Sequence, residues 1–331
     1  LSKLITKYFF LIRIFIKLLP IKPKPPVTIT FFIIFFTIIV YLSILFLILM
    51  KLNFNDITFI IVTYRSEDII KRCLDSLPKE SKKIIIENSN NINLGKELKN
   101  KYDNIEVILS SNIGMGAGNN IGLKACKTSY AYVLNPDTKF HNDTFKNLIE
   151  TLKHINDFTL ASPINDDENY PNYKKTNSSV KIDNNILSVK SIDGFSMLFN
   201  LKKFKDQNFF DENIFLFLEN DDLCLRIKNK NEMIYLITNS FINHKGSISR
   251  SEKLEYLRNW HWMWSKFYFN KKHYGFFPAI SKISINFISA SLKYLFYLLF
   301  FNSHKKKIYK MRVFGIYSSV LGKKSSFRIE D

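Results

Sequence analysis

Cysteine is scarce in this chain of 331 residues, and several familiar signatures are missing. The three cysteines, Cys73, Cys126 and Cys224, are widely spaced and odd in number, so they provide neither a disulfide framework nor a zinc site. Free cysteines predict a reducing compartment. The sequence contains no internal repeat and no helix-turn-helix, zinc-finger or RNA-binding signature. Nucleic-acid binding through one of these common modules is therefore not expected.

Acidic residues are outnumbered by basic ones, and the formal net charge is +19. Such a charge permits nucleic acid, anionic lipid or phosphorylated substrates as partners. The basic residues do not form a single stripe, however. Many stand beside apolar segments at the two ends of the chain: Lys3, Lys7, Arg13, Lys17, Lys22, Lys24, Lys305, Lys306, Lys307, Lys310 and Arg312. This placement favours membrane lipid as a partner and not nucleic acid.

Residues 1–50 are predicted to associate with a membrane. Residues 1–26 mix apolar side chains with spaced cations, which is typical of an interfacial segment. Residues 27–50 carry no charge and are long enough to span a bilayer as a helix. A single span with the cations inside would place the rest of the chain outside. Three alternatives stay open: a second short membrane element at 4–19, a re-entrant or flat segment, or a stretch that is not native to the protein.

From residue 56 the pattern changes to strands that alternate with helices. The first strand, 57–63, is a continuous β-branched apolar run, as expected of a buried parallel strand. This alternation predicts right-handed βαβ units and a parallel sheet. In order, further strands are expected at 83–86, 105–109 and 130–134, and helices at 66–78, 118–127 and 142–154.

The second half is less regular. Residues 163–185 are polar and predict a long loop, whereas 191–199 has strand character. Helices are expected at 220–230, with Leu223, Leu225 and Ile227 buried, and at 254–268. The latter carries Trp260, Trp262 and Trp264, whose rings suit either sugar binding or core packing. Residues 276–301 are apolar but interrupted by two lysines, which predicts an in-plane or hairpin membrane element.

The turn Asn135-Pro136-Asp137 follows the strand at 130–134 directly. In open parallel sheets, ligands bind outside the carboxyl ends of the strands. An acidic turn at that place suits a divalent cation and, through the cation, a diphosphate. The same residues also favour an ordinary strand-ending turn, and that alternative stays open.

Four stretches in this order resemble glycosyltransferase family 2, whose members are nucleotide-sugar transferases with the GT-A fold. They are 60–66, 112–122 with 134–138, 210–212 with 219–226, and 244–247. The likeness covers about residues 56–275 and is strongest to bacterial rhamnosyltransferase-type members. It implies a Rossmann-like α/β domain at 56–250, with a mainly parallel central sheet flanked by helices, and a helical, basic, membrane-associating region at 251–331.

The resemblance also implies an activity. The expected enzyme is inverting, depends on Mn²⁺ or Mg²⁺, and moves a sugar such as rhamnose from a dTDP- or UDP-sugar. Its acceptor would be lipid-linked or a surface polysaccharide. The catalytic domain is expected on the cytoplasmic side of the cell membrane.

By the same resemblance, donor-binding residues follow the ends of the first strands. Thr63 and Tyr64 would receive the nucleotide base, and Glu87, with Asn88, would accept a hydrogen bond from it. Gly114 permits close backbone approach to a ligand. Asn119 is either a donor contact or a helix cap. Asn135 stands where the family's acidic motif begins, and the motif's last acidic residue, Asp137, would hold the metal. His244 matches a distal family histidine that joins the metal, and an imidazole ligand would favour Mn²⁺.

The general base is expected within Glu219–Asp222. The family's usual base position is occupied by Asn220, which cannot accept the proton, so Glu219, Asp221 and Asp222 are the candidates. Asp222 is one helical turn from Arg226 and is expected to pair with it. Glu219 follows the apolar run 214–218, so its carboxylate is expected to be partly desolvated and more basic. Asn220 supports the alternative of a catalytically inactive family member that binds glycan or acts as a scaffold.

Overall fold

The computed structural model describes residues 54–153, 155, 157–174, 181–244, 251–300 and 302–328. Leu52–Asp331 form one compact unit. The membrane elements expected within residues 1–50 lie outside the described residues. Within the described ranges, no helix combines the length and the apolar character needed to cross a membrane.

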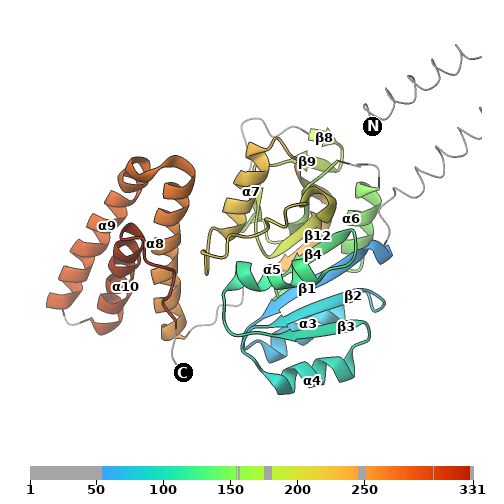
Figure 1. Cartoon of the computed structure of the whole chain (residues 1–331), viewed down its shortest axis with the longest axis horizontal. Coiled ribbons are helices and arrows are strands. Elements are labelled where there is room, and N and C mark those ends of the chain that lie inside the picture. Colours follow the sequence, from blue (N-terminus) through green and yellow to red (C-terminus); the bar gives the residue numbers. More distant parts are fainter. Residues whose placement is uncertain are drawn as a thin grey trace, which may run out of the picture. The chain divides into compact units, whose positions relative to one another are not determined.

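In the described part of the chain, ten strands form one sheet (Figure 1). Its strand order is β3-β2-β1-β4-β11-β6-β12-β9-β8, with β5 paired to β12. The bounds are β1 Ile57–Thr63, β2 Lys82–Glu87, β3 Ile105–Leu109, β4 Tyr130–Leu134, β5 Thr138–Phe140, β6 Leu160–Asn165, β8 Lys181–Asp183, β9 Ile186–Ser188, β11 Ser196–Asn200 and β12 Ile234–His244. Two further strands, β7 Tyr173–Lys174 and β10 Ser191–Ile192, pair with each other.

The prediction of a mainly parallel sheet is correct only in part, because parallel and antiparallel pairs both occur. Strands β1 to β4 are parallel, as their helical connections require. Strand β11 runs antiparallel to both of its neighbours, β4 and β6. Strand β12 is parallel to β6 and antiparallel to β5 and β9. The sheet is therefore mixed.

Helices cover both faces of the sheet. One core cluster joins β1 residues such as Phe59 to α3, α4 and α6, and the other joins β1 residues such as Ile60 to α5 and α7. Because successive strand residues point to opposite faces, one β-branched strand serves both cores. The helix bounds are α3 Glu67–Ser76, α4 Ile92–Lys101, α5 Met115–Ala125, α6 Thr144–Leu152 and α7 Glu219–Asn229.

Several predicted boundaries are wrong for identifiable reasons. Helix α5 begins before the expected residue 118, because Gly114, with φ 99°, ends the preceding loop as the helix N-cap. The strand expected at 191–199 is broken at Asp193–Phe195, where the chain passes from β10 to β11. The polar segment 163–185, predicted as a loop, contains the end of β6 together with β7 and β8. In α7, Leu225 is half-buried rather than buried.

The C-terminal region forms three helices, α8 Glu252–Tyr274, α9 Phe276–Leu299 and α10 Ser303–Val320, drawn in orange to dark red in Figure 1. They share a small core that includes Phe267, Ile283 and Ile316. Helix α8 is longer than the predicted 254–268, and the apolar segment predicted as an in-plane or hairpin element is one continuous helix up to Leu299. The Ser265 hydroxyl of α8 donates to the Leu216 carbonyl at 2.8 Å, which ties these helices to the loop before α7.

Candidate functional site

The predicted donor-binding residues Thr63, Tyr64, Glu87, Asn88, Asn135 and Asp137 lie at or just after the carboxyl ends of β1, β2 and β4. Strand order reverses at the β1–β4 pair, where Ile61 aligns with Leu134 and Thr63 follows two residues later. A reversal of this kind opens a crevice between the loops that follow the two strands. Helix α5 begins at the same edge, with Gly118 packed against Val62 of β1.

Two buried polar atoms in this crevice lack partners. Among the described residues, nothing forms a hydrogen bond with the Thr63 hydroxyl or with the side-chain carbonyl of Asn119. Asn119 lies inside α5, whose N-cap is Gly114, so the cap alternative for Asn119 is wrong. A buried polar group without a partner costs about 1–3 kcal/mol. A polar ligand in the crevice could supply the missing hydrogen bonds.

Glu87 and Asn88 hold the loops of this crevice. The buried Glu87 carboxylate accepts hydrogen bonds from the backbone N–H groups of Ser89 and Asn91. The Asn88 amide donates to the Gly114 carbonyl at 3.3 Å. Both side chains thus hold neighbouring loops in place. A hydrogen bond from the nucleotide base to Glu87 stays a prediction.

Tyr64 directly follows β1, and Gly114 is the N-cap of α5. The half-buried Tyr64 ring has the Arg65 guanidinium 5.3 Å from its centroid. At Gly114, a Cβ would lie 2.6 Å from the Phe215 carbonyl, and the positive φ adds strain for any other residue. Glycine is therefore required there by packing, whether or not a ligand approaches.

Asp137 and His244, 107 positions apart in sequence, form a pair. Antiparallel pairing of β5 with β12 aligns Thr138 with His244. The His244 Nε2 lies 3.3 Å from the Asp137 Oδ1, and the imidazole stacks on Phe195 with a centroid distance of 4.0 Å. A carboxylate and an imidazole are suitable ligands for Mn²⁺. The described residues contain no group of three or more His, Cys, Asp or Glu that could hold a metal. A cation held by this pair would need further ligands from outside the pair, such as the oxygens of a phosphate.

Glu219 opens α7 in an unusual environment. Its Oε2 is buried and has no hydrogen-bond partner in the described part of the chain. Burial raises the pKa of this carboxyl to about 7, and the nearby Asp221 charge adds to the effect. The predicted desolvation of Glu219 is thus confirmed. Phe217 and Leu218, directly before it, both have positive φ, 69° and 67°. Such backbone strain in bulky residues tends to occur at functional sites.

The two neighbouring carboxylates are engaged differently. Asp222 is fully buried and contacts three basic side chains: the Arg226 Nε at 2.9 Å, the His273 Nε2 at 2.8 Å and the Lys272 Nζ at 2.6 Å. The predicted pairing with Arg226 is confirmed, and the contacts of Asp222 with Arg226 of α7 and with Lys272 and His273 of α8 join the two helices. Asp221 pairs with the Lys174 Nζ at 2.6 Å, and 18% of its side chain is exposed.

A turn that the sequence motifs did not single out, Asp193–Phe195, connects the two halves of the site. The Phe195 carbonyl accepts a hydrogen bond from the Asn135 N–H at 2.9 Å, and the Phe195 ring stacks on the His244 imidazole. On the other side, Gly194 packs against Asn220, whose amide donates to the Ile192 carbonyl at 3.1 Å. Burial raises the pKa of Asp193, and the Asp221 charge raises it further. The Asp-Gly pair inside an apolar run was the available signal for this turn.

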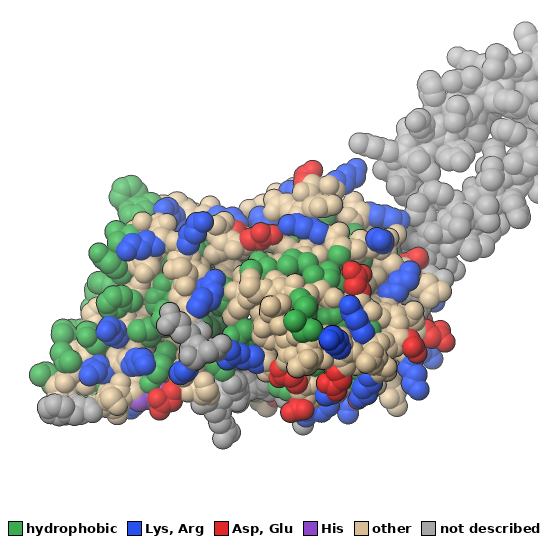
Figure 2. Space-filling model, turned by 60° about the horizontal axis from the view of Figure 1, so that its bottom comes forward, with side chains coloured by type: hydrophobic (Ala, Val, Ile, Leu, Met, Phe, Trp, Pro, Cys, Tyr) green, Lys and Arg blue, Asp and Glu red, His purple; other side chains and the backbone are tan. Residues whose placement is uncertain are grey.

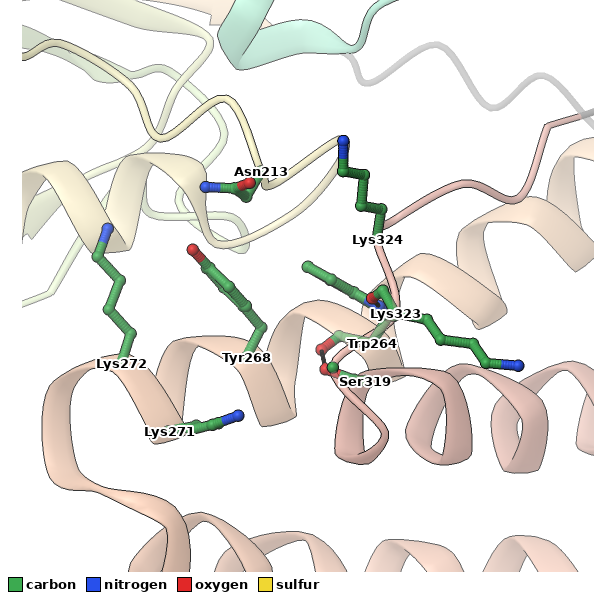
Figure 3. A pocket seen from close by; sticks show the side chains of 9 residues that line it. Asn213, Trp264, Tyr268, Lys271, Lys272, Ser319, Lys323 and Lys324 are labelled. Atoms are coloured by element: carbon green, nitrogen blue, oxygen red, sulfur yellow. Dashed lines mark hydrogen bonds between the residues drawn. The ribbon is translucent and has the colours of Figure 1, made fainter.

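The three tryptophans of α8 do not act together. Trp260 and Trp264 are buried, whereas Trp262 is 41% exposed. Figure 3 shows a pocket of about 380 Å³ on the Trp264 side of α8, beside the turn after α10. The Trp264 indole there donates to the Lys323 carbonyl at 3.0 Å, and no predicted catalytic, donor or metal residue lines the pocket. Core packing is therefore the role of two tryptophans, and only Trp262 presents a ring to solvent.

Residues 58–220 match the family model for glycosyl transferase family 2. The chain contains a glycosyltransferase family 2 domain. This match agrees with the family that the four sequence stretches predict.

Two relatives are similar to this part of the chain. The low-salt glycan biosynthesis hexosyltransferase Agl10 of Haloferax volcanii is 24% identical over 196 residues, which cover 54% of this chain and 63% of the relative. The chain thus spans less than two thirds of that protein. The rhamnosyltransferase WbbL of Escherichia coli is 27% identical over 198 residues, 51% of this chain and 75% of the relative.

A solved structure supports the fold. The mannosyltransferase PcManGT from Pyrobaculum calidifontis, in complex with GDP-Man and Mn²⁺, superposes with a TM-score of 0.51 at 10% identity. The match covers 81% of this chain and 88% of that chain. The fold is accordingly GT-A-like, a mixed α/β sheet flanked by helices.

Proposed function

We propose that this protein is an inverting, metal-dependent glycosyltransferase that moves a sugar from a dTDP- or UDP-linked donor to a lipid-linked or surface-polysaccharide acceptor. Rhamnose is the favoured sugar, because the matched Escherichia coli relative is named a rhamnosyltransferase. The observation that carries the proposal is the Glu219 carboxylate. It is buried, has no partner for Oε2 among the described residues, and has a pKa raised to about 7.

Glu219 would act as the general base. It would take the proton of the acceptor hydroxyl while that oxygen forms a bond to the anomeric carbon. The bond from this carbon to the donor phosphate breaks on the opposite face, and the nucleoside diphosphate leaves with the electron pair. A base with a pKa near the working pH is efficient at such a transfer. Because only ionised Glu219 can accept the proton, turnover should fall as the pH drops below about 7.

Asp137 and His244 would hold the cation at the donor end of the crevice, where their 3.3 Å contact already brings the two ligand atoms together. The cation, when bound, neutralises charge on the leaving diphosphate. Thr63 and Asn119 would place the nucleotide, because each keeps a buried polar atom that is unpaired within the described residues.

We place the protein at the cell membrane, with the domain on the cytoplasmic side, where nucleotide sugars are made. Helix α9 supports this proposal, because it carries an exposed apolar stripe at helical spacing: Phe277, Ile285, Ile288, Leu292, Leu295 and Leu299. Figure 2 shows hydrophobic side chains gathered on the α9 side, with lysines and arginines among them. A helix of this kind suits the interface of an anionic bilayer.

The test of the transferase proposal is a panel of nucleotide sugars with Mn²⁺, read as thermal stabilisation and as nucleoside diphosphate release. A ligand at 100-fold its dissociation constant adds about 2.7 kcal/mol of stability. Stabilisation with release supports the proposal, and no stabilisation by any donor overturns it. Asn220, at the family's usual base position, supports the alternative of an inactive glycan-binding or scaffold protein. Stabilisation by a donor without release in the presence of membrane extract would favour that alternative.

A further inference from the structure

A short C-terminal segment, residues 322–328, follows α10 and runs along α8 without forming a helix or strand of its own. We call it the strap. The Trp264 indole donates to the Lys323 carbonyl at 3.0 Å, which ties the start of the strap to α8 (Figure 3). Further along, the Phe327 ring stacks on Trp260 with a centroid distance of 5.7 Å. The strap is therefore attached to α8 at several points.

His261 of α8 is a central contact of the strap. Its side chain is fully buried, with Nδ1 2.9 Å from the Ser325 hydroxyl and Nε2 2.8 Å from the Phe327 carbonyl. Burial lowers the pKa of His261 to about 4, so the ring is uncharged near pH 7. A carbonyl only accepts hydrogen bonds, so Nε2 carries the proton and Nδ1 accepts from Ser325. The strap thus fixes the tautomer and the orientation of this ring.

The Phe215 ring, in the loop before α7, contacts both His261 and the strap. The His261 imidazole stacks on it with a centroid distance of 4.6 Å, and the Arg328 guanidinium carbon lies 3.5 Å from the ring centroid. Arg328 is itself held by hydrogen bonds to the Ser325 and Phe327 carbonyls. Burial lowers the pKa of Arg328, as expected for a guanidinium that packs on an aromatic ring partly out of water.

Phe215 in turn packs on the first turn of α5. Its carbonyl accepts a hydrogen bond from the Met115 N–H at 3.2 Å, and a Cβ at Gly114 would lie 2.6 Å from the same carbonyl oxygen. Glu219 contacts this turn too, because a Cβ at Gly116 would lie 3.5 Å from the Glu219 Cβ. The loop from Phe215 to Glu219 is therefore seated on the same turn of α5 at both of its ends.

This loop adopts a strained backbone. Phe217 and Leu218 both have positive φ, which bulky residues keep only where surrounding contacts enforce it. Helix α8 and the strap provide such contacts. The Ser265 hydroxyl holds the Leu216 carbonyl at 2.8 Å, and the Arg328 guanidinium covers the neighbouring Phe215 ring.

We infer that Arg328 and His261 are positioning residues, which act through Phe215 to hold the loop before α7 against α5 and so keep Glu219 in its buried place. Their role in catalysis rests on the proposed transferase function. The inference goes beyond that function because it makes the C-terminal strap, remote in sequence from the matched family domain, a part that the site requires.

Hydrogen exchange of the full chain tests this support. In Arg328→Ala, peptides that contain Met115 or Phe217 should exchange about tenfold faster, the scale expected for the loss of one cation–π contact. Peptides from β1 should exchange as in the wild type. Lys324→Ala, which removes an exposed cation of the same strap, is the matched control. Unchanged exchange in Arg328→Ala, or equal changes in both variants, would overturn the inference.

The pH dependence of turnover separates positioning from a general loss of stability. Burial raises the pKa of Glu219 to about 7, and among the described charges Asp221 adds to the shift. If the loop loosens, water reaches Glu219 and its pKa falls, so the acidic limb of turnover in Arg328→Ala should move down by about one pH unit. Direct removal of a positive charge would instead raise this pKa. An acidic limb that stays in place or moves up would contradict the inference.

Ser325→Ala provides a second, milder variant, because it removes only the hydroxyl that donates to His261. It should change the exchange rates and the acidic limb in the same directions as Arg328→Ala, by smaller amounts. Should Arg328→Ala not fold, this variant decides the question, and wild-type exchange in Ser325→Ala would then overturn the inference.

The two proposals fail separately, because hydrogen exchange needs no substrate. If nucleotide sugars are turned over but both strap variants behave as the wild type, the strap inference is overturned alone. If Arg328→Ala loosens α5 and the loop before α7 while no nucleotide sugar stabilises the wild type, the supporting contact is upheld and the transferase proposal is overturned.

Discussion

Replacing Glu219 by glutamine should abolish turnover and, at neutral pH, stabilise the fold. The substitution keeps the shape of the side chain but removes its charge and its basicity. Loss of a general base lowers turnover by about 10²- to 10⁴-fold. Donor binding should be kept, because Glu219 belongs to the acceptor end of the site. Turnover is measured as nucleoside diphosphate release, with the donor that stabilises the wild-type protein.

The stability effect follows from the raised pKa. The shift from 4.5 to about 7 means that the folded state holds the proton more tightly than the unfolded state. The wild-type free energy of unfolding therefore decreases as the pH rises from about 4.5 to 7, and the full penalty, about 3 kcal/mol, applies above pH 7. The Glu219→Gln variant lacks this penalty. Its stability advantage over the wild type should grow from under ~1 kcal/mol at pH 5 to about 3 kcal/mol at pH 8.

Urea unfolding at the two pH values checks the stability effect, with Glu106→Gln, an exposed position on β3, as the matched control. A pH-independent difference for Glu219→Gln would refute the desolvated carboxylate. Wild-type turnover in this variant would refute its role as the base. Asp221→Asn should cost less activity, because Asp221 is paired with Lys174. If Asp221→Asn is inactive while Glu219→Gln turns over, the two roles are reversed.

Three further predictions concern the metal, the membrane and the core. Asp137→Ala should abolish transfer and weaken Mn²⁺-dependent binding of nucleoside diphosphate while circular dichroism stays native, and His244→Ala should be milder; full activity of Asp137→Ala would remove the metal role. Deleting residues 1–50 should leave a folded domain that binds anionic vesicles at low salt and is released from them at high salt. If the truncated protein does not bind such vesicles at low salt, α9 and α10 do not form a membrane-binding surface. Gly122→Ala should cost about 1–3 kcal/mol in urea unfolding, because its Cβ would overlap Ile60, whereas Gly95→Ala, whose nearest contacts are 3.5 Å away, should be tolerated; equal effects would contradict the packing of α5 on β1.

The first half of the fold is readable from the sequence because its signals are local. Strands β1 and β4 are mostly apolar, β2 contains the apolar run 84–86, and all three strands are almost entirely buried. In the second half of the fold, polar side chains form part of the buried core. Asn172 lies in the segment predicted as a loop, yet it is fully buried and bonds to the Pro163 carbonyl and the Asn165 N–H. A polar side chain that satisfies buried backbone has no apolar signature, so periodicity cannot find it.

The sequence predicts those site residues that belong to short local motifs. Asp137 and Glu219 were predicted from the strand end and the apolar run that precede them. The Asp193–Phe195 turn was not, because its importance comes from joining Asn135, His244 and Asn220, which are remote in sequence.

The distribution of unpaired polar atoms connects stability to function. In the described part of the chain, four buried side-chain atoms lack a hydrogen-bond partner, on Thr63, Asn119, Asn200 and Glu219. Three of them belong to the site predicted from sequence, and each costs the fold about 1–3 kcal/mol. A chain selected for stability alone would pair or remove such groups. The proposed function accounts for these three atoms: the donor would supply partners at Thr63 and Asn119, and the acceptor hydroxyl would supply one at Glu219.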